Sequence, residues 1–182
     1  KPQLEPVQVG IKRLVVKAPA KLPYLSMAWK VPVLRDLHKE REPYALEMLA
    51  AVLDGHEAAR FSRNLVRGSK IAVSAGAGYD ATVRGEALFV VSGTPAEGRS
   101  VAELEAALRA EIVRVASEGV SAQELERVKT QTIAAQVYKR DSMMAQAMEI
   151  GALSLPAAST TRSYWPLTCV APSRSPAALC AS

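Results

Sequence analysis

Two long helices follow one another directly in this sequence, with no strand between them. Each begins with a capping box, in which a serine caps the helix and a glutamate follows three residues later: Ser100 with Glu103, and Ser121 with Glu124. The first helix keeps an apolar stripe until Gly119, and the second is expected to run from Ala122 through Val137. A chain that alternates single strands with single helices builds a parallel sheet, so this succession favours the α+β class instead.

Strand patterns lie upstream of this helix pair. The run IKRLVVK (11–17) is rich in β-branched residues, and in 25–31 apolar residues alternate with small or polar ones. These two runs are expected to form a hairpin or strand pair. Residues 71–93 predict two or three further strands, with turns near Gly78–Asp80 and Gly85. The most apolar segment, ALFVV (87–91), is expected to be a central strand.

Shorter helices complete the pattern. Pro43 suits a first helical position, and apolar residues recur at helical spacing from Leu46 to Leu53. Gly55 is expected to supply a left-handed cap, and a short helix is predicted over 57–66. A further helical stretch covers 142–153. The sequence therefore predicts an α+β fold with a mostly antiparallel sheet and helices packed on one face.

The two ends differ in character from this central region. Residues 1–10 carry two prolines and a glycine and are expected to be a linker from a preceding domain. Because the chain opens on Lys1 without a targeting pattern, we expect a piece of a longer protein, and its compartment is unknown. The domain itself is expected over 11–153. The segment 154–182 is rich in Ala, Ser, Pro and Thr and indicates a disordered tail, an altered reading frame or an artificial end.

Candidate metal, thiol and phosphate sites are weak. A zinc peptidase needs H-E-x-x-H or H-x-x-E-H, but His38 lies in HKERE and His56 in GHEAAR, and neither has a second histidine nearby. Cys169 and Cys180 lack C-x-x-C spacing and a neighbouring histidine. Three glycines in the strand region, Gly76, Gly78 and Gly85, do not complete a dinucleotide or phosphate-loop motif and are interpreted as turns at strand edges.

The formal net charge of +5 permits an anionic partner. The main basic cluster is spaced at helical intervals: Arg60, Arg63, Arg67 and Lys70. It is interpreted as a solvated or subunit-facing helix surface, with a basic wall facing a peptide or an acidic partner surface as an alternative. Because only Phe61 offers a stacking ring nearby, nucleic acid is not expected as a partner. No run approaches the roughly 18 apolar residues of a membrane span, so no membrane partner is expected either.

Ordered blocks over about 9–153 resemble the C-terminal half of a pitrilysin/insulinase-type zinc metallopeptidase. The most specific block is EGVSAQELERVK, followed by the succession of helix, Leu-Asp-Gly, Arg-Phe and Leu-Val-Arg around 44–67. The chain is most similar to bacterial members described as zinc proteases, which are related to the mitochondrial processing peptidase. The resemblance implies a clamshell of two homologous halves. Since H-x-x-E-H is missing here, this chain would be the inactive half and zinc would lie in the other.

Two departures from the family pattern limit this resemblance. Many inactive halves supply an Arg and a Tyr, seven positions apart, that hold the substrate backbone. The matching positions here are Val66 and Val73, whose side chains cannot donate a hydrogen bond, so the role is not transferred. A shift by one residue gives Arg67 and Ser74, which is not the family pattern. The final helix and strand of the family are also not recognisable after Leu153.

Two functional hypotheses follow. In the first, the chain is the lid and substrate-chamber half of a zinc-dependent endopeptidase, with no catalytic or metal-binding residue of its own. Its partners would be the zinc-bearing half, in the same parent chain or a separate subunit, and a peptide substrate. In the second, it is a non-catalytic assembly subunit. A homodimer of the isolated chain is a further expectation.

Overall fold

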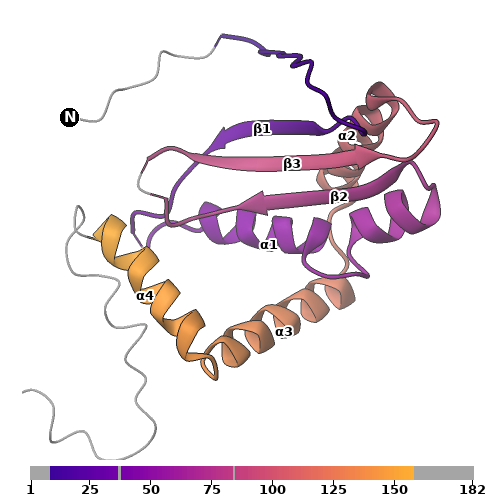
Figure 1. Cartoon of the computed structure of the whole chain (residues 1–182). Coiled ribbons are helices and arrows are strands. Elements are labelled where there is room, and N and C mark those ends of the chain that lie inside the picture. The colour runs from indigo at the N-terminus through magenta and orange to yellow at the C-terminus, as the bar shows by residue number, and fades with distance from the viewer. Residues whose placement is uncertain (1–8, 37, 84, 158–182) are drawn as a thin grey trace, which may run out of the picture.

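A three-stranded antiparallel sheet forms the centre of the computed structural model, which describes residues 9–36, 38–83 and 85–157 (Figure 1). The strands are β1 (Leu25–Val31), β2 (Ala72–Tyr79) and β3 (Ala87–Pro95), in the order β1-β3-β2. Helix α1 (Glu42–Asp54) and the π-helix η1 (Ser62–Gly68) join β1 to β2. Helices α2 (Val101–Glu118), α3 (Ala122–Lys139) and α4 (Met143–Ala157) follow β3. The fold is therefore α+β, as the sequence predicts.

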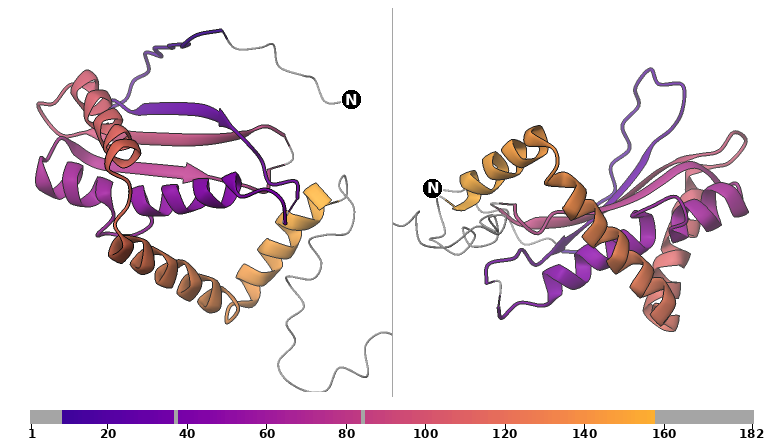
Figure 2. Two further views of the ribbon diagram at one scale, coloured as in Figure 1. Left: turned by 180° about the vertical axis from the view of Figure 1, so that it is seen from behind. Right: turned by 90° about the horizontal axis from the view of Figure 1, so that it is seen from below.

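The central place of ALFVV in the sheet is confirmed. Strand β3 pairs with β1 on one side and β2 on the other, and every second residue of it is buried. Leu104 and Leu108 of α2 are fully buried and pack in the same cluster as Phe89 and Val91 of β3. The helices α1 and α2 lie on one side of the sheet, whereas α4 and the segment 9–24 project on the other (Figure 2). The core thus lies between one sheet face and these two helices.

The two predicted capping boxes differ in the structure. At α2 the box is complete: Ser100 Oγ accepts from the Glu103 N–H, and the Glu103 carboxylate accepts from the Ser100 N–H at 2.7 Å. At α3, Ser121 Oγ accepts from the Glu124 N–H at 3.2 Å, but the Glu124 carboxylate binds Arg60 instead. The second helix starts where predicted, and its glutamate has a different partner.

Three local predictions are wrong. Residues 11–17 form no strand, because no described segment makes backbone hydrogen bonds with them, and their side chains remain exposed, although Arg13 pairs with Glu105 of α2. Gly55 has a right-handed φ of −65°, and a Cβ there would lie 2.5 Å from the Ala51 carbonyl oxygen, so lack of space rather than handedness favours glycine. The short helix begins at about Arg60 and ends at Gly68, later than predicted.

Gly93 determines how closely the sheet and α2 approach. A Cβ at this buried position would lie 2.9 Å from the Ser74 carbonyl oxygen and 3.3 Å from Leu104 Cδ2. We expect Gly93→Ala to lower the free energy of unfolding by about 1–3 kcal/mol, because backbone or helix must shift. Gly78→Ala in the neighbouring strand is the control, since a Cβ there meets nothing within 4 Å. Equal unfolding midpoints in urea for the two variants would contradict the prediction.

The helices α3 and α4, which we call the arm, bury few of their side chains. Val128 is the buried residue of α3, and the apolar residues of α4 that the structure describes are mostly exposed, for example Met143 (87%) and Met148 (68%). Among the described residues, no helix is both long and apolar enough to cross a membrane. The predicted tail 154–182 lies outside the described residues from 158 onward.

Candidate functional site

The sheet face opposite α1 and α2 is a candidate surface. Strand alternation places Ser92 and Val90 of β3 on this face, beside Ser26 and Ala28 of β1. In β2, on the other side of β3, Gly76 is paired with Ser92 and Gly78 with Val90. Apart from Val90, the residues named on this face have small side chains or, at the glycines, none. We call this surface the open face; it suits contact with an extended chain better than it suits catalysis.

The glycines of β2 correct one sequence interpretation. Gly76 and Gly78 lie inside the strand, not in turns, whereas Gly85 lies in the connection between β2 and β3. At the outer edge of β2, the Ala77 N–H donates to Asp54 Oδ2 at 3.4 Å, and a Cβ on Gly76 would lie 3.1 Å from the same oxygen. Burial raises the pKa of the Asp54 carboxyl. This carboxylate therefore covers one edge of the sheet.

The junction of η1 and β2 holds the positions matched to the family Arg and Tyr. Val66 is half-buried and packs against the core, and Val73 is 57% exposed beside a register shift between Ala72 and Ser74. Arg67, in the shifted match, donates to the Glu57 carbonyl oxygen. Ser74 is exposed and faces Thr94 of β3. Neither valine side chain can donate or accept a hydrogen bond, whereas the exposed Ser74 hydroxyl can do both.

Both histidines lie in turns, and only the His56 side chain takes part in the hydrogen bond of its turn. The His38 backbone N–H donates to Asp36 Oδ1, and His56 Nδ1 accepts from the Ala58 N–H at 3.0 Å. Within residues 9–36, 38–83 and 85–157, no group of three or more His, Cys, Asp or Glu could hold a metal ion. Zinc therefore does not fit the residues that the structure describes. Cys169 and Cys180 lie outside them.

His56 has one feature that can be tested. Because Nδ1 accepts a hydrogen bond, the neutral ring carries its proton on Nε2, which is buried without a partner among the described residues. Burial and the nearby Arg127 lower the pKa of His56. The unfolded chain therefore binds this proton more readily, and stability falls as the pH drops from above 6.5 through the folded-state pKa.

We expect His56→Asn to flatten this pH dependence. The asparagine oxygen can accept from the Ala58 N–H in the same turn but does not titrate. The measurement is the urea midpoint at pH 7.5 and 5.5 for both proteins. If the urea midpoint of the variant fell as much between pH 7.5 and 5.5 as that of the wild type, His56 would not be the source of the pH dependence.

The basic cluster does not form one surface. Arg60 is buried, and its guanidinium binds the Glu124 carboxylate at 2.8 and 3.0 Å and the Gly119 carbonyl oxygen at 3.0 Å. Arg63 and Arg67 are exposed on η1, and Lys70 follows the helix with a φ of 51°. The predicted helix surface is therefore wrong for Arg60 and Lys70. Arg60 connects the start of η1 to the start of α3.

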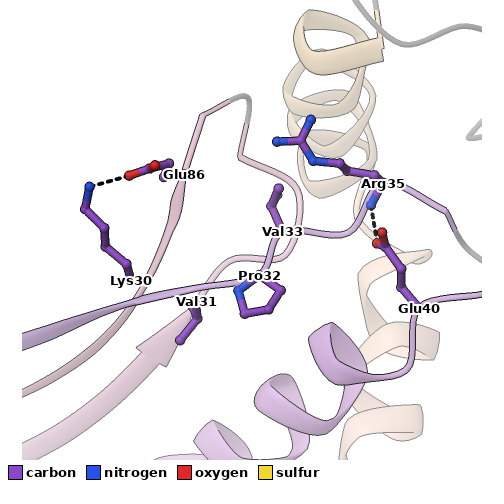
Figure 3. Close-up of a pocket in the computed structure, with 7 residues that line it drawn as sticks. All are labelled: Lys30, Val31, Pro32, Val33, Arg35, Glu40 and Glu86. Carbon is purple, nitrogen blue, oxygen red and sulfur yellow. Dashed lines mark hydrogen bonds and ion pairs between the residues drawn. The ribbon is translucent and has the colours of Figure 1, made fainter. Parts of the chain in front are cut away.

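Sequence reasoning missed a pocket of about 400 Å3 where the chain leaves β1 (Figure 3). Its charged side chains come from three separate segments: Lys30, Arg35 with Glu40, and Glu86. The Lys30 ammonium pairs with Glu86 at 2.6 Å. No motif marks these residues; only the alternation in β1, which places Lys30 on the open face, hints at their position.

The chain thus combines a three-stranded antiparallel sheet, covered by α1 and α2 on one side, with an open face on the other. The model of the peptidase M16 inactive domain matches residues 1–132, and the chain belongs to this family. The resemblance to the C-terminal half of such metallopeptidases is thereby confirmed. No curated protein matches the chain.

Solved structures show the same fold. A protease from Helicobacter pylori superposes with a TM-score of 0.66 at 16% identity, over 79% of this chain and 34% of that one. This chain thus spans about a third of that protease. The inactive peptidase domain of a "putative zinc protease" from Bordetella parapertussis superposes with a TM-score of 0.63 at 15% identity, over 85% of this chain and 78% of that one. A "putative zinc protease" from Bordetella pertussis superposes with a TM-score of 0.60 at 16% identity, over 80% of this chain and 74% of that one.

Proposed function

We propose that this chain is the non-catalytic half of a zinc-dependent endopeptidase and forms one wall of its substrate chamber. The open face supports the proposal, because small residues such as Ala28, Gly78 and Ser92 lie along it and leave room for an extended chain. An extended peptide can lie against such a surface without displacing large side chains. The domain responsible would cover 11–153, with 1–10 as a linker.

The zinc-bearing half would supply the chemistry. Zinc lowers the pKa of a bound water and polarises the peptide carbonyl. This half would exclude bulk water and confine the peptide, and its Val66 and Val73 would contribute contacts but no hydrogen bond. Relative motion of the halves would admit substrate.

Peptide hydrolysis tests this proposal. A quenched fluorescent peptide library is incubated with this chain and with the longer gene product that contains it, each with and without chelator. Cleavage by the longer product alone, abolished by chelator, is the expected result. Chelator-sensitive cleavage by this chain alone would contradict the proposal.

A bulky residue on the open face gives a sharper test. We expect Gly78→Trp in the longer product to reduce kcat/KM by about tenfold or more, because the indole occupies space needed by the peptide. Val113→Trp is the control, since Val113 is 63% exposed on α2, which lies on the covered side of the sheet. Equal activities of the two variants would show that the open face does not meet substrate.

An assembly subunit is the second candidate. The exposed apolar residues of α3 and α4 favour it, since patches of this kind mark protein interfaces: Ile133, Val137, Tyr138, Met143, Met144, Met148 and Ile150. Sedimentation of the isolated chain, alone and with a separately expressed peptidase half, tests for homodimer and heterodimer. A complex that forms only through this arm and leaves hydrolysis unchanged would favour assembly over the chamber wall.

A further inference from the structure

In the pocket beyond β1, the Arg35 guanidinium has no partner among the residues that the structure describes. Glu86 pairs with Lys30, and Glu40 Oε2 accepts from the backbone N–H groups of Arg35 at 2.7 Å and Asp36 at 3.3 Å. Both carboxylates of the pocket are therefore engaged. The Arg35 guanidinium makes no hydrogen bond or ion pair with any residue that the structure describes, and Arg35 is exposed.

The pocket has an apolar side as well as a charged one. Val31, Pro32 and Val33 line it where the strand ends, and the Arg35 side chain extends away from the Glu40 carboxylate, toward the side on which Val33 lies (Figure 3). A guanidinium binds a carboxylate through two parallel hydrogen bonds. A ligand with a carboxylate next to an apolar group can therefore place the carboxylate on the Arg35 guanidinium and the apolar group against Val31 and Val33.

The position of the pocket suggests how a peptide reaches it. β1 is an edge strand, and no described segment forms backbone hydrogen bonds to its outer side. The other edge strand, β2, has the Asp54 carboxylate at its outer side. A peptide that pairs as an added strand with the outer edge of β1 runs along it to Val31, the last residue of β1. Because Val31 also lines the pocket, such a peptide reaches the pocket.

We propose that this pocket binds a carboxylate of an extended peptide, with Arg35 as the positioning cation and the outer edge of β1 as the backbone contact. The proposal rests on the chamber function above and specifies the substrate: peptides with an acidic side chain or a free C-terminal carboxylate. Arg35 holds the peptide and takes no part in bond cleavage.

Fluorescence anisotropy on the isolated chain tests the proposal without any peptidase activity. The probes are three labelled, N-acetylated octapeptides of Ser, Ala and Val: one with a free C-terminal carboxylate, one C-terminally amidated, and one amidated with an internal Glu. We expect the wild type to bind at least one carboxylate peptide about tenfold more tightly than the uncharged amide. The carboxylate peptide that binds more tightly shows whether the pocket prefers a C-terminal carboxylate or a Glu side chain.

Variants assign the binding to Arg35. We expect Arg35→Gln to weaken binding of the carboxylate peptide by about tenfold and to leave binding of the amidated peptide unchanged. Arg35→Lys is expected to bind the carboxylate peptide with an intermediate affinity. Arg41→Gln is the control, because Arg41 is exposed but lies outside the pocket. Equal binding of acid and amide, no binding at all, or full binding by Arg35→Gln would overturn the proposal. A longer product that lacks chelator-sensitive cleavage while this binding persists would instead contradict only the chamber function.

Discussion

Replacing Arg60 with alanine is expected to lower the free energy of unfolding by about 3–5 kcal/mol. The Arg60 and Glu124 side chains are only 9% and 12% exposed, and two hydrogen bonds join them. The variant leaves the Glu124 carboxylate and the Gly119 carbonyl oxygen without their donor. A loss of this size is a large part of the stability of a domain, so partial unfolding at 25 °C is expected.

The control for this substitution is Arg63→Ala, three residues away on an exposed position. Its expected effect is within about 0.5 kcal/mol. A double variant, Arg60→Met with Glu124→Leu, is expected to be more stable than Arg60→Ala, because it leaves no unpaired buried charge. Urea unfolding followed by far-UV circular dichroism measures all of them. Similar losses for Arg60→Ala and Arg63→Ala would show that the buried pair does not stabilise the fold.

Acid is expected to weaken the same pair. The Arg60 guanidinium lowers the pKa of the Glu124 carboxyl below its usual value of 4.5. The stabilisation is therefore complete above pH 4.5 and is lost as the pH falls through the folded-state pKa. In Arg60→Ala this part of the acid dependence disappears.

Arg60 also shows where sequence reasoning succeeds and where it stops. The family resemblance depends on two blocks, one with Arg60 and Phe61 and the other with Glu124, and the structure joins them by this ion pair. Helical spacing alone grouped Arg60 with Arg63 and Lys70, because spacing cannot reveal a partner 64 residues away in the chain.

The strands illustrate the same limit. ALFVV was predictable as a central strand because it is the most apolar of the strand segments, and the structure confirms its place between β1 and β2. IKRLVVK has the same β-forming composition, but a strand also needs a neighbour to bond with, and no described segment supplies one. The pocket could not be predicted, since Lys30, Arg35 and Glu86 meet only after the sheet forms.

Phe61→Ala is the second large effect, and it tests the hydrophobic side of the same short helix. The Phe61 side chain is fully buried and belongs to the cluster of Leu53, Leu65, Leu104 and Leu108 that joins the helices to the sheet. Truncation to alanine removes the whole phenyl ring and leaves a cavity, so we expect the free energy of unfolding to fall by about 3–5 kcal/mol.

Matched substitutions separate this cavity from a general effect of losing an aromatic ring. Phe61→Leu keeps part of the volume and is expected to cost about 1–2 kcal/mol. Tyr138→Ala, at a side chain 72% exposed on α3, is expected to change stability by no more than about 0.5 kcal/mol. Urea midpoints of the three variants provide the measurement. If Phe61→Ala were no more costly than Tyr138→Ala, η1 would not be anchored in the core, and the η1–β2 end of the open face would lack a rigid support.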